Sequence, residues 1–215
     1  MKRVLLILLL MHHMCMAQIP VELFTGHERA TFDVLFFKNF LTKEEKKSYW
    51  LFFNRNRLSV DYRITSTNYL PSFGATEAIS YNDPKWKGWA PVAVVQIFNN
   101  GVFPKAGIQY VHIKKHFTFF SWLVTETNVD LDIDHFILMR YTPIVKDQTQ
   151  LFIQLETVSV FPTVSNSLFS FTQRSRMGLQ YKHFQSGIGI DLNQRGRKTL
   201  TYTNNIGLFF RYDFQ

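Results

Sequence analysis

The chain has almost no cysteine and only one long hydrophobic run. Cys15 is the single cysteine among 215 residues, so the chain cannot form an internal disulfide. Small exported domains usually depend on disulfides. Beyond the N-terminal run, no apolar stretch approaches the ~20 residues that a membrane-spanning helix needs. These absences argue against a disulfide-stabilised domain and against a helical membrane protein.

The one hydrophobic run has the features of a secretory signal peptide. Two basic residues precede the apolar stretch 4–11, and Ala17 ends a small-residue cleavage pattern. This order of charge, short apolar core and small residues is typical of exported proteins. Acylation of Cys15, as in a lipoprotein, would require small residues just before it, and two large residues stand there. We therefore predict a signal peptide over 1–17 and a single mature domain over 18–215.

The chain carries an excess of positive charge, with 24 lysines and arginines against 16 aspartates and glutamates. Two of the basic residues lie in the predicted signal peptide. A basic excess is typical of nucleic-acid-binding proteins, but an exported chain does not meet nucleic acid. The excess therefore does not indicate a nucleic-acid partner.

The last eleven residues, 205–215, alternate between apolar and mostly polar positions, as in a strand whose two faces differ. This strand resembles the C-terminal strand of bacterial outer-membrane β-barrels, which the barrel-assembly machinery recognises. The residues that match the family pattern are Asn205, Gly207, Phe210, Tyr212 and Phe214. Gln215 departs from it, because the family more often ends on the aromatic residue. The resemblance implies an outer-membrane barrel of a Gram-negative bacterium, and the chain as a whole also resembles outer-membrane proteins of Bacteroidota.

Alternating segments separated by turn-forming residues continue along the mature chain. Segment 18–30 is polar and is interpreted as a periplasmic lead-in. The predicted strands are 30–41, 48–53, 57–65, 74–82, 89–98, 105–113, 116–126, 135–145, 150–161, 167–181, 184–193 and the C-terminal strand 205–215. The sequence thus predicts an all-β fold, a closed antiparallel up-and-down transmembrane β-barrel of about 12 strands, with about 10 as the alternative count.

The predicted connections between strands alternate in length. The short ones are 54–56, 83–88, 114–115, 146–149 and 182–183, and the mostly longer ones are 42–47, 66–73, 99–104, 127–134, 162–166 and 194–203. Outer-membrane barrels have short periplasmic turns and longer outer loops, with both termini inside. The alternation therefore assigns a side of the membrane to each connection.

An exported, soluble β-protein is the alternative fold, because it too would show short strands and turns. Phenylalanine accounts for 22 residues, and a lipid-facing surface explains that number more directly than a soluble core does. Aromatic residues near strand ends are also typical of the girdle of a membrane barrel. The predicted girdle residues are Trp50, Trp86, Trp89, Trp122, Tyr141, Tyr181 and Tyr212.

If the apolar face of each strand meets lipid, the opposite face lines the lumen. An arginine facing lipid at the midplane costs ~2–4 kcal/mol, which fixes the register of the arginine-bearing strands. The predicted lumen-lining residues are Asp61, Arg63, Arg140, Gln154, Glu156, Arg174, Arg176, Gln180, Asp191 and Arg211. We expect Glu156 to meet the neighbouring arginines and Asp191 to neighbour Arg211. Such a charge ladder either fills the lumen or lines a narrow pore that selects small polar or anionic solutes.

Some outer-membrane barrels are lipid hydrolases or acyltransferases that use a serine–histidine pair. Here the best acid–base candidate is His135, which is close in sequence to Asp132 and Asp134 and across a predicted loop from Ser121 and Glu126. No signature of those enzyme families is matched, so we predict no catalytic residues. His112 and His116 are separated by a predicted turn and lack a third ligand, so we predict no metal site and no cofactor.

The sequence therefore favours an integral outer-membrane barrel that serves either as a narrow passive channel or as an accessory subunit of a larger outer-membrane complex. A lipid-modifying enzyme and a soluble periplasmic β-protein are the alternatives. The expected partners are outer-membrane lipid and lipopolysaccharide, the assembly machinery and a partner in such a complex.

Overall fold

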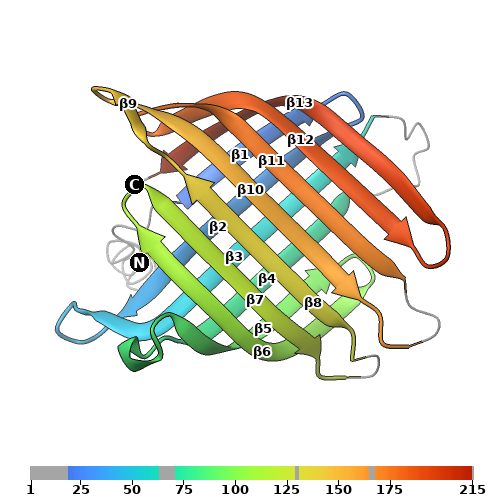
Figure 1. Ribbon diagram of the computed structural model, residues 1–215, viewed down its shortest axis with the longest axis horizontal. Helices are drawn as coiled ribbons and strands as arrows, with labels where there is room; N and C mark the ends of the chain where they lie inside the picture. Colours follow the sequence, from blue (N-terminus) through green and yellow to red (C-terminus); the bar gives the residue numbers. More distant parts are fainter. Residues whose placement is uncertain (1–18, 63–70, 129–130, 165–167, 215) are drawn as a thin grey trace, which may run out of the picture.

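The computed structural model describes residues 19–62, 71–128, 131–164 and 168–214, which form one continuous sheet (Figure 1). Its strands are β1 (Ile19–Gly26), β2 (Arg29–Leu41), β3 (Lys47–Asp61), β4 (Ser72–Tyr81), β5 (Trp89–Phe98), β6 (Gly101–Lys114), β7 (Phe117–Glu126), β8 (Ile133–Tyr141), β9 (Ile144–Lys146), β10 (Thr149–Phe161), β11 (Phe169–Tyr181), β12 (Phe184–Gly196) and β13 (Leu200–Phe214). Among the described residues, no helix is long and apolar enough to cross a membrane.

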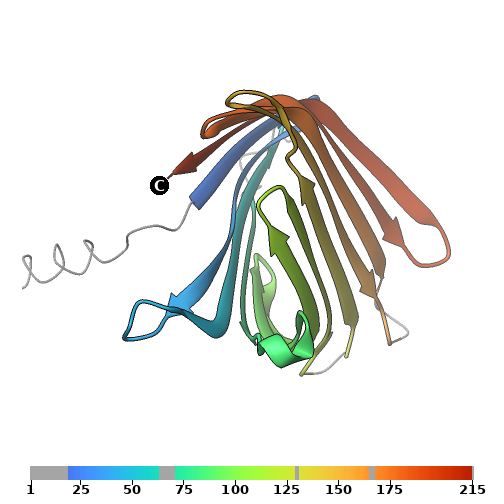
Figure 2. The same cartoon turned by 60° about the vertical axis from the view of Figure 1, so that its left-hand side comes forward.

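The sheet closes on itself. Neighbouring strands pair antiparallel in chain order, and β1 pairs with β13 to complete the ring. The three-residue strand β9 pairs only with the first two residues of β10. Most of β10 pairs with β8 on one side, and β11 pairs along its other side. The predicted closed antiparallel barrel of twelve long strands is confirmed. Figure 2 shows the ring from the side, with the start of β1 and the end of β13 at the same end.

The strand count is correct although two of the predicted strands are wrong. Segment 18–30 is not a lead-in, because β1 lies within it and forms the closing pair with β13. Residues 54–56 are not a turn, because β3 runs through them without interruption and pairs there with both β2 and β4. The prediction missed β1 and divided β3 into the two strands 48–53 and 57–65, so the total number of strands is unchanged.

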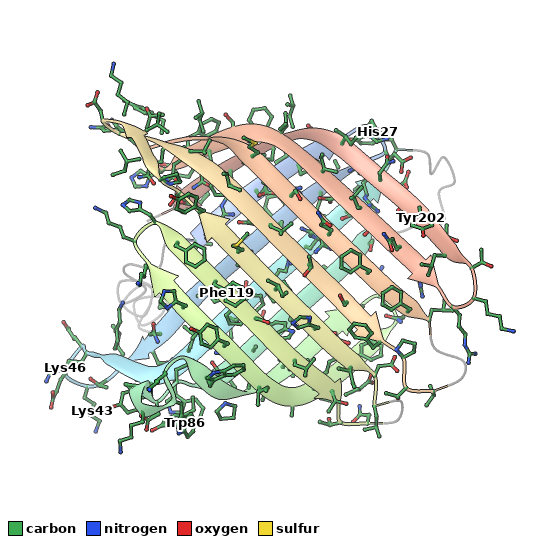
Figure 3. All side chains as sticks on the ribbon, in the orientation of Figure 1. His27, Lys43, Lys46, Trp86, Phe119 and Tyr202 are labelled. Carbon is green, nitrogen blue, oxygen red and sulfur yellow. The ribbon has the colours of Figure 1, made fainter. Side chains whose placement is uncertain are left out.

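We call the end of the barrel where β1 begins and β13 ends the terminal end, and the opposite end the far end. The connections at the terminal end are 42–46, 82–88, 115–116, 142–148 and 182–183. Those at the far end are 27–28, 62–71, 99–100, 127–132, 162–168 and 197–199. The predicted connections 83–88, 114–115, 146–149 and 182–183 do lie at the terminal end, as expected. The prediction is wrong for 42–47, which was expected at the far end and lies at the terminal end, and the lengths do not alternate, since 99–100 at the far end has two residues. Figure 3 marks the two ends, with Lys43, Lys46 and Trp86 at one and His27 and Tyr202 at the other.

The outer surface is mostly apolar on every strand of the ring. Large hydrophobic side chains are exposed on each of the strands, for example Leu23 on β1, Ile108 on β6 and Met177 on β11. Six of the predicted girdle residues are exposed, and all six lie at the terminal end. Trp122 is the exception, because its side chain is only 4% exposed and points inward.

Trp122 belongs to an apolar half of the interior that the sequence did not predict. It packs with Phe53, Phe120 and Phe136 at ring-centroid distances of 4.9–5.4 Å. Leucine, valine and alanine side chains from β2, β4, β5, β7 and β8 complete this cluster. Charged and polar side chains occupy the other half, so the interior has an aromatic side and an ionic side.

Candidate functional site

An ion-pair cluster crosses the lumen between β3 and β10. Arg55 Nη2 donates to Asp33 Oδ2 at 2.7 Å on the adjacent strand β2, and its Nη1 donates across the lumen to Glu156. Arg57 Nη2 also donates to Asp33, at 2.5 Å, and Arg174 Nη1 donates to Glu156. Three guanidinium groups thus share two carboxylates. We call these five residues the central cluster.

A second set of charges lies beside the central cluster. Arg176 on β11 donates through Nε to Glu22 Oε1 at 2.8 Å and through Nη1 to Asp191 Oδ1 at 2.7 Å. Its guanidinium carbon lies 4.0 Å from the centroid of the Phe24 ring, which places the cation over an aromatic face. Both carboxylates and the arginine are buried, so the pairing offsets the cost of removing these charges from water.

Towards the terminal end, Gln154 accepts hydrogen bonds from two arginines. Arg140 Nε donates to its Oε1 at 2.9 Å, and Arg211 Nη1 donates to the same atom at 3.2 Å. Both guanidinium groups lie over the Phe152 ring on β10, which contacts Phe209 on β13 at a centroid distance of 5.5 Å. Side chains from strands that are not neighbours therefore meet in the interior at this level as well.

The lumen is filled at the level of these clusters. Glu156 is 1% exposed, and Phe120, Leu138, Phe152 and Phe209 are fully buried. A water-filled pore would expose the side chains that line it. Twelve strands lie between the eight-stranded barrels that side chains fill and the sixteen-stranded porins that hold an aqueous channel. In this conformation the barrel belongs with the filled ones.

A cavity of about 830 Å³ opens above the clusters at the far end. Its lining comes from the far-end halves of the strands, including Arg57 and Ser59 on β3, Thr172 on β11 and Asn193 on β12. The central cluster and the aromatic side form its floor, since Arg55 and Phe53 also line it. The interior is therefore open at the far end and closed by side chains at the level of the central cluster.

The structure brings together most of the predicted lumen-lining residues. Those in or beside the ionic clusters are Arg140, Gln154, Glu156, Arg174, Arg176, Asp191 and Arg211. Asp61 lines the cavity, and Gln180 lies near the terminal end, where its side chain donates to the Lys182 carbonyl at 3.0 Å. Arg63 lies outside the described residues. The expected proximity of Asp191 to Arg211 is wrong, because Asp191 pairs in register with Asn205 and binds Arg176 instead.

Several interior charges were not predicted. Glu22 lies in the missed strand β1, and Arg55 lies in the segment interpreted as a turn. Asp33 and Arg57 complete the central cluster. Lys105 Nζ donates to Asp134 Oδ2 at 2.6 Å in a further buried pair on the aromatic side. Alternation of polar and apolar residues on β2 and β3 is the sequence signal that could have found Asp33 and Arg55.

The catalytic candidates are only partly assembled. Ser121 Oγ and His135 Nε2 lie 3.3 Å apart, but both residues are on the outer face of the barrel. Asp134 points inward to Lys105, and Asp132 Oδ1 accepts from the Thr163 backbone amide. Neither aspartate orients the imidazole, so the third member of a catalytic triad is not in place. Among the described residues, no group of three or more histidine, cysteine, aspartate or glutamate side chains is close enough to hold a metal ion.

A polar cluster interrupts the apolar outer surface halfway along β3 and β4. Asn54 Nδ2 donates to Glu77 Oε1, and Asn56 Nδ2 donates to Asn54 Oδ1 at 3.1 Å. Glu77 Oε2 is buried and has no hydrogen-bond partner among the described residues. The pair Asn54–Glu77 lies midway between the aromatic pair Trp50–Tyr81 at the terminal end and Leu58–Phe73 at the far end.

Two residues of the C-terminal pattern have structural roles in closing the barrel. The fully buried Asn205 accepts from the backbone amide of Glu28 at 2.9 Å through Oδ1 and donates from Nδ2 to the carbonyl of Arg29 at 3.0 Å. Gly207 pairs with Gly26 so closely that an added Cβ would lie 1.9 Å from the Thr25 carbonyl oxygen. Asn205 thus ties the β1–β2 turn to β13, and Gly207 permits the close approach.

Comparisons with known proteins add little to this picture. No protein-family model matches the sequence, and a search of the curated proteins finds no match. Among solved structures, a chain from work on the in-meso crystallization of membrane proteins is 14% identical, with a TM-score of 0.40 over 92% of this chain and 83% of that one. A triple mutant of the Rhodopseudomonas blastica porin is 8% identical, with a TM-score of 0.29 over 92% and 99%. At these identities and TM-scores, we draw no conclusion from the similarity. The assignment of the fold depends only on the strand pairing described above.

Proposed function

We propose that the protein is an integral β-barrel of a Gram-negative outer membrane, exported by the predicted signal peptide 1–17. The outward apolar side chains on every strand support this proposal, because a soluble protein that exposed so much apolar surface would aggregate. The C-terminal strand is then the assembly signal. The basic connection 197–199 at the far end would meet lipopolysaccharide phosphates.

Within the membrane, the barrel acts as a narrow channel that is closed at the central cluster. The cavity at the far end supports this role, since it stops at the Arg55–Glu156 bridge. Only side-chain contacts, not backbone, separate the cavity from the terminal end there. Small polar solutes would pass when that bridge opens, and the surplus guanidinium group would favour anions.

The channel is tested by removing the bridge. In planar bilayers we expect the wild-type barrel to be nearly silent and the bridge variant, Arg55→Ala/Glu156→Ala/Phe152→Ala/Phe209→Ala, to show clear conductance steps, because it loses large side chains that fill the lumen at both levels. Adding Arg174→Glu to it should shift selectivity from anions to cations. The matched control is Glu44→Ala/Lys46→Ala, which removes an exposed ion pair. Equal silence of the wild type and the bridge variant would rule out the channel, and equal conductance would rule out the closed lumen.

The outer polar cluster favours a second role, as a subunit of an outer-membrane complex. A carboxylate halfway along a lipid-facing surface is unfavourable, and ionisable groups within membranes usually have a partner. Glu77 Oε2 is buried without a hydrogen-bond partner among the described residues, so its carboxylate must turn outward to meet a partner, and the amides of Asn54 and Asn56 lie beside it. A contacting protein with hydrogen-bond donors at this height would satisfy the cluster.

This second role predicts a change in assembly. Purified in mild detergent, the wild type should retain a partner chain, and Asn54→Leu/Glu77→Leu should release it because the polar contact is lost. Ser186→Leu, an outward change on the opposite wall, serves as the control and should retain the partner. A wild-type protein that purifies as a monomer with no other chain would contradict this role.

A further inference from the structure

The far-end cavity has two chemically different walls. On one side lie arginines and hydroxyl or amide side chains, with Arg57 on β3 and Arg174 and Thr172 on β11. On the other lie the aromatic rings of Phe53, Trp122 and Phe136. Neither a purely polar nor a purely apolar molecule complements both walls.

The cavity meets the arginines of the central cluster and not the carboxylates behind them. Arg55, Arg57 and Arg174 line it, whereas Asp33 and Glu156 are not among its lining residues. Because three guanidinium groups share two carboxylates, one positive charge in the central cluster is uncompensated.

The other charges at the cavity leave its lining basic. Five arginines line it against three aspartates, Asp61, Asp134 and Asp191. Asp134 is bound to Lys105, and Asp191 shares Arg176 with Glu22, so the group of Arg176, Asp191 and Glu22 has one net negative charge. Arg29 and Arg195 supply further positive charge near the mouth. Arg57 Nε is buried with no hydrogen-bond partner among the described residues, so the Arg57 guanidinium group would gain a hydrogen bond by turning its Nε toward a ligand in the cavity.

We propose that this cavity binds a small amphipathic anion. Its oxyanion group, a carboxylate or phosphate, accepts hydrogen bonds from Arg57 and Arg174. Its compact apolar body packs against Phe53, Trp122 and Phe136. A volume of about 830 Å³ is within the usual range of small-molecule sites, ~300–1,000 Å³. Binding requires the folded barrel but not conduction, so it can be tested apart from the channel.

The test is calorimetric titration of the purified barrel in a non-ionic detergent, with protein-free micelles as the background. The probe is 4-phenylbutyrate, and its neutral amide and acetate are the comparison ligands. We expect saturable binding of the acid. The amide should bind about tenfold more weakly because it loses charge-assisted hydrogen bonds, and acetate should bind more weakly because it lacks the apolar body.

The variant Arg174→Gln should weaken binding of 4-phenylbutyrate about tenfold. It should still fold, because Glu156 retains Arg55. Lys198→Gln removes the same charge from the far end but outside the cavity, and it should bind as the wild type does. The proposal is overturned if the acid shows no saturable heat, if the amide binds as tightly as the acid, or if Arg174→Gln binds unchanged. The first two of these results are measured on the wild-type protein, so they do not depend on the folding of a variant. Binding of the acid by the wild type, together with silence of both the wild type and the bridge variant in bilayers, would reject the channel alone.

Discussion

Glu156→Ala should lower the free energy of unfolding by about 3–5 kcal/mol, the usual cost of removing one partner from a buried ion pair. The change leaves Arg55 sharing Asp33 with Arg57 and leaves Arg174 without a carboxylate, while all three guanidinium groups stay inside the barrel. Urea titration of the refolded barrel, followed by tryptophan fluorescence, measures the loss.

The matched control for this prediction is Glu44→Ala. Glu44 also forms an ion pair, with Lys46 at 2.7 Å, but both side chains are largely exposed. Exposed pairs contribute little to stability, so this variant should unfold as the wild type does. Equal unfolding of the Glu156 and Glu44 variants would contradict a lumen filled by buried charges.

Gly178→Ala should destabilise the barrel by about 3 kcal/mol or more, at the upper end of overpacking effects. Gly178 on β11 faces Gly187 on β12 directly. A Cβ on Gly178 would lie 2.0 Å from the Ser186 carbonyl oxygen, a backbone atom that cannot move unless the two strands separate. The fraction of protein that refolds into lipid vesicles and resists unfolding in gels run without heating measures the effect.

Gly74→Ala is the control for the glycine prediction. A Cβ there would meet the Phe98 ring at 3.1 Å, and a side chain at the rim of the cavity can rotate away. We expect this variant to refold normally. If both alanine variants refolded alike, the close approach of β11 and β12 would not be a requirement of the fold.

The fold was predictable because the alternation of polar and apolar residues distinguishes the inner face of most strands from the outer face. The long strands β10 and β11 show this best, with Glu156, Arg174 and Arg176 on one face and apolar residues on the other. The errors came from local propensity. Residues 54–56 have the composition of a turn, yet cross-strand pairing holds them extended, because Asn54 bonds Glu77 and Arg55 reaches Glu156. Tertiary contacts override turn preference there.

The aromatic half of the interior could not be predicted from one sequence. Both faces of β5 are apolar along most of its length, and β7 carries phenylalanines on both faces. Alternation then separates two faces without showing which one lies on the outside of the barrel. The inward position of Trp122 depends on Phe53 and Phe136, which lie on other strands of the ring. The extent of the far-end cavity likewise depends on side-chain contacts across the lumen, which one sequence does not show.

Disulfide trapping across the closing pair of strands tests the central claim most directly. Leu23 and Phe210 are Cα partners on β1 and β13, and both side chains point outward. The only native cysteine lies in the predicted signal peptide. In cells that express Leu23→Cys/Phe210→Cys, a closed barrel in the outer membrane predicts an oxidised cross-link in the membrane fraction, and none for Leu23→Cys/Ile206→Cys, which is out of register. Recovery of the chain in the soluble fraction, or failure of the in-register pair to cross-link, would contradict the account.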